Sequence, residues 1–214
     1  MVDERGLFVV IDGCEGTGKS TQIGWLAESF RQVGRDVILT LEPGGTDVGI
    51  AIRTLLLDPQ YHEMLPMTEL CLFSAARAQH CDQVIRPALH DGKVVVSDRY
   101  DAATYAYQGY AGSVGVETVC KVTELTSGLD PDLALIFDLD PEIGMARKFS
   151  DTPDRIEQKT LDFHQRVRSG FLAYAAERDY AIVINADGIL AEVHVRVIEA
   201  ANECLGIDLP VLGF

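Results

Sequence analysis

The residues best suited to chemistry lie close to the N-terminus, in a glycine-rich segment that ends in a lysine and a hydroxyl. It matches the spacing G-x-x-x-x-G-K-[ST] and consists of Gly13, Cys14, Glu15, Gly16, Thr17, Gly18, Lys19 and Ser20. Glycines let successive backbone N–H groups converge on phosphate oxygens, and a helix starting here adds its positive end. The pattern predicts that residues 13–21, including Thr21, bind nucleotide phosphates, with Lys19 at the β- and γ-phosphates and Ser20 on Mg²⁺.

Further polar residues follow two other apolar runs. Asp98 closes the run 93–98, which is the strongest strand candidate in the chain, and Arg99 comes directly after it. The run 36–41 ends in the turn-rich segment 42–46. Because ligands of open α/β sheets gather at the carboxyl ends of parallel strands, we expect both places to contribute to the site. Asp98 is the predicted carboxylate partner of Mg²⁺.

Composition restricts the classes of partner. The chain has 214 residues, 18 Lys plus Arg and 33 Asp plus Glu, which gives a net charge of −15. This balance argues against nucleic acid or an anionic membrane as a partner. No export signal is recognisable, no apolar run reaches the ~20 residues of a membrane helix, and the five scattered cysteines suit reduced thiols. We therefore expect a cytoplasmic location.

The elements that must position these residues alternate between strands and helices. Strands are predicted at 7–11, 36–41, 93–98, 133–138 and 181–184, and helices at 21–33, 50–57, 67–90, 116–126, 159–178 and 189–205. The segment 67–90 is predicted as one long helix or two, which Pro87 should bend or end late, and Gly109, Gly112 and Gly115 indicate a mobile loop. The alternation predicts one α/β domain over residues 1–214, a doubly wound parallel five-stranded sheet with helices on both faces.

Five motifs in one order resemble those of the bacterial thymidylate kinase family. They are Ile11 to Ser20, Glu42-Pro43-Gly44-Gly45-Thr46, Phe73-Ser74-Ala75-Ala76-Arg77, Asp98-Arg99-Tyr100 and Asp154-Arg155-Ile156-Glu157. The resemblance runs from residue 11 to about residue 168, and the last forty residues match only in general pattern. It implies a phosphate-loop kinase fold and transfer of the ATP γ-phosphoryl group to dTMP, giving dTDP and ADP. Because the acceptor phosphate is already largely dianionic at neutral pH, this chemistry needs cations and alignment more than a general base.

The resemblance also implies roles for individual residues. Lys19 and Arg99 would be catalytic, with Arg99 holding the acceptor phosphate against the donor. The predicted substrate residues are Glu15 at the sugar 3′-hydroxyl, Pro43 in the turn, Phe73 stacked on thymine, Arg77 at its O4 edge, Thr104 at N3 and Tyr107 against C2′. Arg147 and Arg155 flank a lid near 147–156 and would supply charge to the transition state. A homodimer is implied as well.

The chain departs from the family pattern at two places. Leu41 stands where the family usually has an arginine, and the lid segment 147–151 has a thinner basic run. Arg53 is predicted to cover the acceptor phosphate in compensation. Two alternatives stay open: a kinase for another pyrimidine monophosphate, such as dUMP or UMP, and a weakly active nucleotide-binding protein. A guanine-specific switch is disfavoured because 185–188 lacks the lysine of N-K-x-D.

Overall fold

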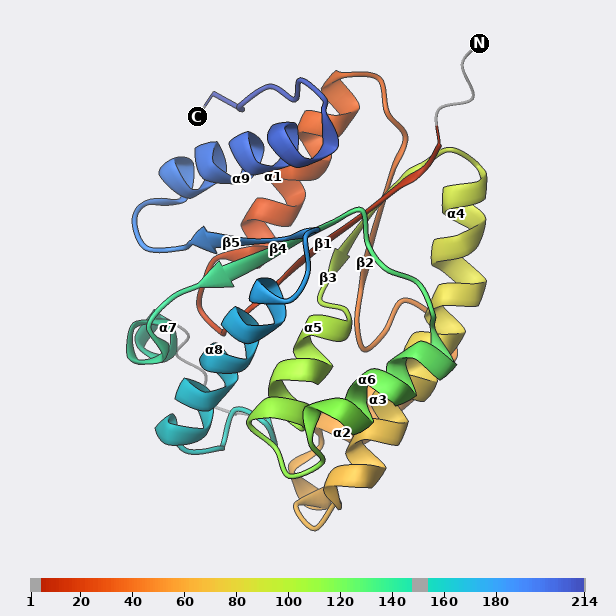
Figure 1. The fold of residues 1–214 in the computed structure, drawn as a ribbon, viewed down its shortest axis with the longest axis vertical. Helices are drawn as coiled ribbons and strands as arrows, with labels where there is room; N and C mark the ends of the chain where they lie inside the picture. Colours follow the sequence, from red (N-terminus) through yellow and green to blue (C-terminus); the bar gives the residue numbers. More distant parts are fainter. Residues whose placement is uncertain (1–4, 148–153, 214) are drawn as a thin grey trace.

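The computed structural model describes residues 5–147 and 154–213 and contains one five-stranded parallel sheet in the order β2-β3-β1-β4-β5 (Figure 1). The strands are β1 (Leu7–Gly13), β2 (Val37–Leu41), β3 (Val94–Asp98), β4 (Leu133–Asp138) and β5 (Ala181–Asn185). The central strand β1 pairs in parallel with both β3 and β4. The predicted doubly wound α/β architecture is therefore confirmed, and its switch point lies beside the glycine-rich loop that follows β1.

Helices cover both faces of the sheet, and successive side chains of β1 point alternately into the two cores between the sheet and these helices. Val9 and Ile11 belong to the core under α1 (Lys19–Gln32) and α9 (Leu190–Leu205). Phe8 and Val10 belong to the opposite core, which also contains residues of α8 (Leu161–Ala176). Because both faces of β1 are buried, its sequence is a continuous apolar run.

Helix α1 connects the glycine-rich loop to the core. Gly18 precedes it at φ 83°, and Ile23, Leu26, Ala27 and Phe30 are buried along one side. At its other end Gly34 has φ 82°, with Gly34 N–H bonded to Arg31 O and Arg35 N–H bonded to Phe30 O. This pair of bonds is a Schellman motif, so glycine stands at the predicted stop position.

The chain between β2 and β3 forms a second helical layer. It contains α2 (Asp47–Leu57), a short 3₁₀ turn (Pro59–Tyr61), α3 (Pro66–His80) and α4 (Arg86–His90). A π-helical turn, Cys81–Ile85, joins α3 to α4. Pro87 has no N–H for the normal helical bond, and the wider turn just before it absorbs this loss, so the predicted bend takes the form of a π-bulge.

Two helical segments were not predicted. The first is α5 (Asp101–Thr104) with its π-helical continuation Tyr105–Tyr110, which leads towards α6 (Val116–Thr126). Gly109 was predicted in a loop but lies in this continuation, where a Cβ would come within 3.2 Å of Val116 Cα. The second is α7 (Pro141–Arg147), only seven residues long. The prediction for Gly109 was wrong because close packing on α6, and not a turn, requires a small residue there.

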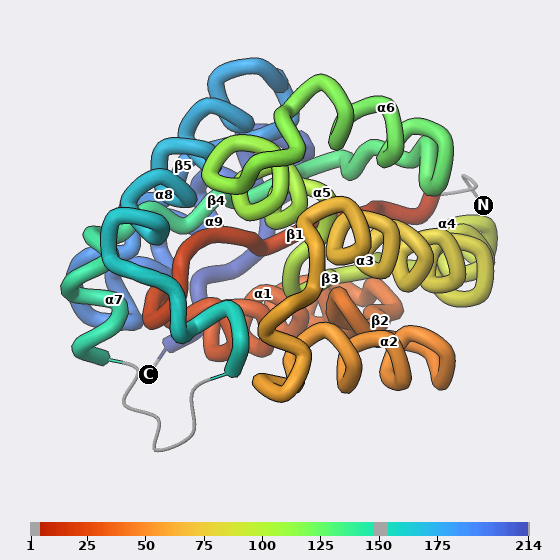
Figure 2. Tube along the Cα trace, turned by 90° about the horizontal axis from the view of Figure 1, so that it is seen from below, coloured from red at the N-terminus to blue at the C-terminus, as the bar shows by residue number. Residues whose placement is uncertain are grey.

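Figure 2 shows α7 at one side of the molecule and α2, α3 and α4 at the other. Most of the predicted lid, residues 148–153, lies outside the described residues. Among the helices of the described ranges, none combines the length and apolar character that a membrane span requires.

Candidate active site

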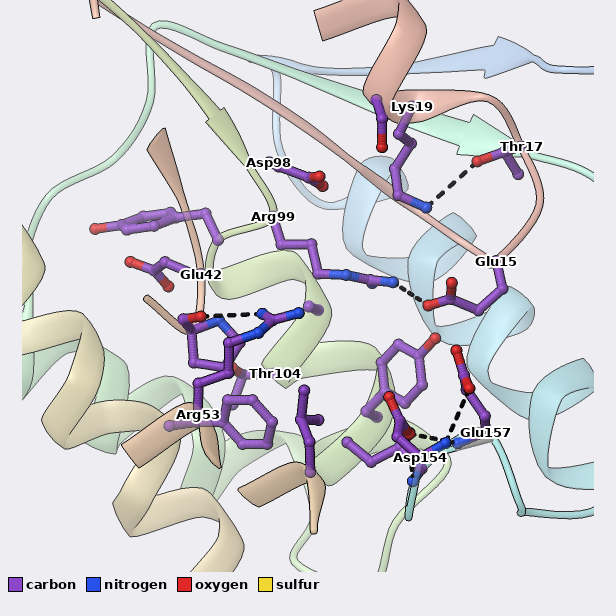
Figure 3. Close-up of a pocket in the computed structure, with 18 of the residues that line it drawn as sticks. Glu15, Thr17, Lys19, Glu42, Arg53, Asp98, Arg99, Thr104, Asp154 and Glu157 are labelled. Atoms are coloured by element: carbon purple, nitrogen blue, oxygen red, sulfur yellow. Dashed lines mark hydrogen bonds and ion pairs between the residues drawn. The ribbon is translucent and has the colours of Figure 1, made fainter. Parts of the chain in front are cut away.

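A cavity of about 420 Å³ lies where the strands β1, β2 and β3 end, between the glycine-rich loop and α3. Most residues singled out in the sequence line it: Glu15, Gly16, Thr17, Gly18, Lys19, Ser20, Thr21, Pro43, Arg53, Phe73, Arg77, Asp98, Arg99, Thr104 and Tyr107. In Figure 3, Lys19 and Asp98 lie at one end, Glu42, Arg53 and Thr104 at the other, and Arg99 between them. The fold thus brings the predicted phosphate and acceptor residues into one space.

The glycine-rich loop is held by hydrogen bonds from Lys19 within it and by α7, which packs against its outer surface. Lys19 Nζ donates to the carbonyl oxygens of Gly13 at 3.1 Å and Cys14 at 2.5 Å. On the outside α7 packs directly on the loop, because a Cβ at Gly16 would lie 2.1 Å from Gly144 O and one at Gly144 would lie 2.3 Å from Glu15 O. Burial, together with the charge of Arg99, lowers the pKa of Lys19 to about 8. An anion placed in this loop would relieve that cost.

Arg99 occupies a constrained position at the centre of the cavity. It is the one non-glycine residue of the described chain with positive φ, at 69°. Its guanidinium pairs with Glu15, approaches Asp12 Oδ1 at 3.4 Å and donates to Gly13 O at 3.3 Å. A left-handed backbone costs a side-chain-bearing residue about 1 kcal/mol or more, so the fold holds this side chain in place against a local preference.

Asp12 was not assigned a role from the sequence, yet it organises the strand ends around Arg99. Its carboxylate accepts backbone N–H bonds from Gly13 at 2.9 Å, Tyr100 at 3.2 Å and Ala103 at 2.9 Å. Burial raises the pKa of Asp12 to about 6, although Arg99 and these N–H groups oppose the shift. An acid at the end of a buried strand is the signal that could have identified it.

Asp98 and Ser20 carry oxygen atoms that suit a metal ion held partly by phosphate oxygens. Both line the cavity, and Asp98 Oδ1 is buried with no hydrogen-bond partner among the described residues. Mg²⁺ is commonly bound through one or two carboxylates together with waters and phosphate oxygens. One unpartnered carboxylate oxygen and one hydroxyl beside a phosphate loop fit that requirement.

Arg77 forms the opposite end of the cavity and is completely enclosed. Its Nε donates to Glu42 at 2.7 Å, and NH2 donates to Tyr100 O at 3.0 Å and Thr104 Oγ1 at 2.7 Å. NH1 has no hydrogen-bond partner within the described chain. Three acceptors fix the guanidinium, and NH1 is the donor group left to bind a ligand.

The remaining cavity residues differ in how tightly they are held. Phe73 lies on α3, one turn before Arg77, and is partly buried. The Tyr107 ring is buried, and its centroid lies 5.8 Å from the Arg99 guanidinium carbon. Arg53 donates to Pro43 O at 3.0 Å. Leu41 is exposed, lies beside Gly44 and is not among the residues that line the cavity, so the effect of the missing arginine stays a prediction.

Neither predicted lid arginine lines the cavity. Arg147 donates to Ala186 O at 3.5 Å and to Asp187 at 3.3 Å. Arg155 is buried, donates to Leu56 O at 2.9 Å and lies 2.5 Å from Glu69. Their catalytic role therefore stays a prediction, and in the described arrangement both are bound to other parts of the chain.

The polar cavity residues Gln108 and His164 were not assigned a role from the sequence. Gln108 donates to Glu69 at 2.6 Å, and the same carboxylate pairs with Arg155. His164 lies on α8 and its Nε2 is buried with no hydrogen-bond partner in the described ranges. Burial lowers the pKa of His164. Neither residue has a local pattern that distinguishes it from a core position.

Comparison with known proteins identifies the family. A family model described as thymidylate kinase matches residues 11–197. The thymidylate kinase of Pelotomaculum thermopropionicum is 45% identical over 206 residues, which is 94% of this chain and 95% of that protein. The chain belongs to the thymidylate kinase family. The thymidylate kinase of Desulforapulum autotrophicum is 43% identical, over 95% and 94% of the two chains.

A solved structure supports the same assignment. The crystal structure of thymidylate kinase from Ehrlichia chaffeensis superposes with a TM-score of 0.76 and 29% sequence identity, over 91% of this chain and 98% of that one. The family model extends beyond residue 168, where the recognisable motifs of the sequence end. The family resemblance inferred from the five motifs is therefore confirmed.

Proposed function

We propose that this protein transfers the γ-phosphoryl group of ATP to dTMP and releases dTDP and ADP. The observation that carries the proposal is one cavity lined by the phosphate loop, by Arg99 and by Arg77, whose NH1 is buried without a hydrogen-bond partner among the described residues. A donor triphosphate at the loop and a pyrimidine at Arg77 place the acceptor phosphate beside Arg99. Such positioning and charge neutralisation are most of what phosphoryl transfer requires.

The base end favours a pyrimidine with a 4-oxo group and a protonated N3. Arg77 NH1 is a donor and would meet the O4 oxygen. Thr104 Oγ1 already accepts a bond from Arg77 and has a second lone pair for the N3 proton. Phe73 supplies a face on which the ring stacks. Cytosine presents the opposite pattern at both atoms, so we expect it to be rejected.

Residues at the phosphate end would bind and neutralise the negative charges of the two phosphate groups. Lys19 would leave the carbonyls of Gly13 and Cys14 for the β- and γ-phosphates, and Arg99 would exchange Glu15 for the acceptor phosphate. Glu15 is assigned to the sugar 3′-hydroxyl. Bound at Ser20 and Asp98, Mg²⁺ would neutralise charge on the transferred group. We assign Tyr107 to the sugar wall and Arg53 to the acceptor phosphate.

We extend the proposal to the remaining features that follow from the family. Arg147 and Arg155, which flank residues 148–153, would add positive charge around the transferred group. Residues 1–214 would act as one domain, and two such chains would form a homodimer in the cytoplasm. Gel filtration with light scattering tests the dimer, which is rejected if the protein runs as a monomer at micromolar concentration.

The activity is tested by measuring ADP release with MgATP and five acceptors: dTMP, dUMP, UMP, dCMP and dGMP. We expect turnover with dTMP and a preference for it over dCMP of more than 100-fold, since a buried site that pairs a donor and an acceptor rejects an inverted pattern strongly. Preference for UMP or dUMP would replace the assigned acceptor while keeping the chemistry. The absence of turnover with any monophosphate would overturn the proposal.

A further inference from the structure

Behind the base end of the cavity, four polar side chains form a buried chain of hydrogen bonds. Thr40 Oγ1 lies 2.6 Å from His80 Nε2, His80 Nδ1 lies 3.0 Å from Glu42 Oε1, and Arg77 Nε donates to Glu42 Oε2 at 2.7 Å. All four residues are buried, and His80 is 0% exposed. The chain therefore leads from Thr40 on β2, through His80 on α3 and Glu42 in the loop after β2, to Arg77, which is one of the residues lining the cavity.

The chemistry of these groups fixes the orientation of the His80 ring. A carboxylate only accepts, and Glu42 Oε2 is already occupied by Arg77, so His80 Nδ1 must carry the proton that reaches Oε1. In the neutral ring Nε2 then accepts the proton of the Thr40 hydroxyl. With both ring nitrogens used, His80 holds the Glu42 carboxylate in one plane, and that plane sets the direction of the Arg77 fork.

The surrounding backbone is shaped to admit this ring. Arg77 and His80 are three residues apart on α3, so they share one face of the helix and both reach Glu42. A Cβ at Gly45 would lie 2.5 Å from His80 Cδ2 and 2.8 Å from Thr40 Oγ1. The second glycine of the 42–46 loop thus leaves the space that the ring occupies.

We propose that His80 is a positioning residue for base selection: acting through Glu42, it aims Arg77 NH1 into the cavity as a fixed donor that accepts a 4-oxo pyrimidine and rejects a 4-amino pyrimidine. This inference rests on the proposed function, because it concerns the same base site. A guanidinium that could tilt would lower the fit to O4 and also relax the conflict with a 4-amino group. His80 touches neither the base nor the phosphates, so its effect belongs to recognition and not to the transfer step.

The experiment compares His80→Leu with His80→Asn. Leucine removes both bonds, whereas asparagine keeps an N–H donor near the position of Nδ1. We expect His80→Leu to raise KM for dTMP about tenfold, to lower the dTMP over dCMP preference in kcat/KM about tenfold, and to leave kcat for dTMP within about twofold, as expected for the loss of about one well-placed hydrogen bond. His80→Asn should recover most of both losses.

A matched control separates positioning from loss of stability. His194 is also 0% exposed and pairs with Gln22 through Nδ1, but it lies on α9 against α1. His194→Leu should change the melting temperature without changing KM for dTMP or the dTMP over dCMP ratio. If His194→Leu shifts that ratio as much as His80→Leu does, or if His80→Leu leaves it unchanged, the inference is wrong.

Two further measurements keep the outcome decisive. Should His80→Leu fail to fold, Thr40→Val reaches the same chain from its other end and should lower the ratio about threefold; an unchanged ratio there contradicts the inference. Calorimetric binding of dTMP without ATP separates the two proposals, since a wild-type protein that binds dTMP but transfers nothing defeats the proposed function alone. In that case the dissociation constants of the variants for dTMP and dCMP still decide the role of His80.

Discussion

The two ends of the cavity hold their arginines in different ways. Arg77 is 1% exposed and is surrounded by its acceptors Glu42, Tyr100 O and Thr104. Arg99 keeps a positive φ and pairs with Glu15, a residue of the phosphate loop itself. At the base end, three internal acceptors fix Arg77 and one donor group stays unpaired among the described residues, as the proposed recognition of a base requires. At the phosphate end, opposite charges are paired that a bound phosphate would separate, as the proposed phosphoryl transfer requires.

The shifted pKa values support this contrast. At the phosphate end, burial raises the pKa of Asp12 to about 6 and lowers that of Lys19 to about 8. Both shifts disfavour the charged forms that the chemistry needs. Unfavourable electrostatics of this kind are found where function opposes stability. Substitutions at the two ends should therefore separate into effects on kcat and effects on KM.

Arg99→Met should give the largest loss. Removing a charge that stabilises the transferred group costs about 10²- to 10³-fold in kcat, and we expect about 10³-fold here because Arg99 lies between the two ends. KM for dTMP should change less than tenfold. Steady-state kinetics with dTMP as the varied substrate give both values. A large rise in KM with kcat preserved would show that Arg99 recognises and does not catalyse.

Arg77→Lys should show the opposite division. Lysine keeps the charge beside Glu42 but cannot reproduce the planar fork, so the donor towards the base is lost. We expect KM for dTMP to rise about 30-fold, from hydrogen bonds worth about 2 kcal/mol, with kcat within about threefold at saturation. The two arginine variants serve as controls for each other. If both lower kcat equally, the contrast between the two ends fails.

The sequence predicted the local parts of both ends, and missed their long-range partners. The phosphate loop, the strand-end Asp98-Arg99 pair and the Phe73/Arg77 turn of α3 are continuous patterns, and all of them line the cavity. Glu42 meets Arg77 across 35 positions and Asp12 meets Arg99 across 87. No periodicity encodes such pairings, because they form only when the fold brings the ends of β1, β2 and β3 together and places α3 beside them.

The helix α7 was missed for a different reason. At seven residues it is too short to show a helical period, and its start is encoded instead by Asp140, whose carboxylate caps Glu142 N–H at 2.9 Å, and by Pro141. Its contact with the phosphate loop depends on two glycines, Gly16 of the loop and Gly144 of α7, and no pattern in the sequence pairs them. Local sequence signals can identify where a helix begins and ends, but a contact between two glycines far apart in the sequence is found only in the three-dimensional structure.

Gly144→Ala tests whether α7 supports the phosphate end alone. The new Cβ would lie 2.3 Å from Glu15 O, so the helix or the loop must move. We expect KM for ATP to rise about tenfold, roughly 1.4 kcal/mol of lost binding, while the dissociation constant for dTMP changes less than twofold. Gly24→Ala in α1 is the matched control, since a Cβ there meets nothing within 4 Å. Equal effects of the two substitutions would remove α7 from the site.

Lys19→Met should have the smallest of the predicted effects, a small gain in the stability of the folded protein. Thermal unfolding without nucleotide measures it. Lys19 has a pKa of about 8 in the folded protein against 10.5 for an ordinary lysine, so below pH 8 its full burial cost is present. Methionine removes that cost and should raise the melting temperature by about 2–4 °C at pH 7. As pH rises from 8 to 10.5, folding releases the proton of Lys19, the wild type gains stability and the difference shrinks. Lys121→Met is the control, because that lysine is exposed and forms an exposed ion pair with Glu117. A difference that is absent at pH 7, or that grows with pH, would mean that Lys19 is satisfied by the loop carbonyls and that the phosphate end is as self-contained as the base end.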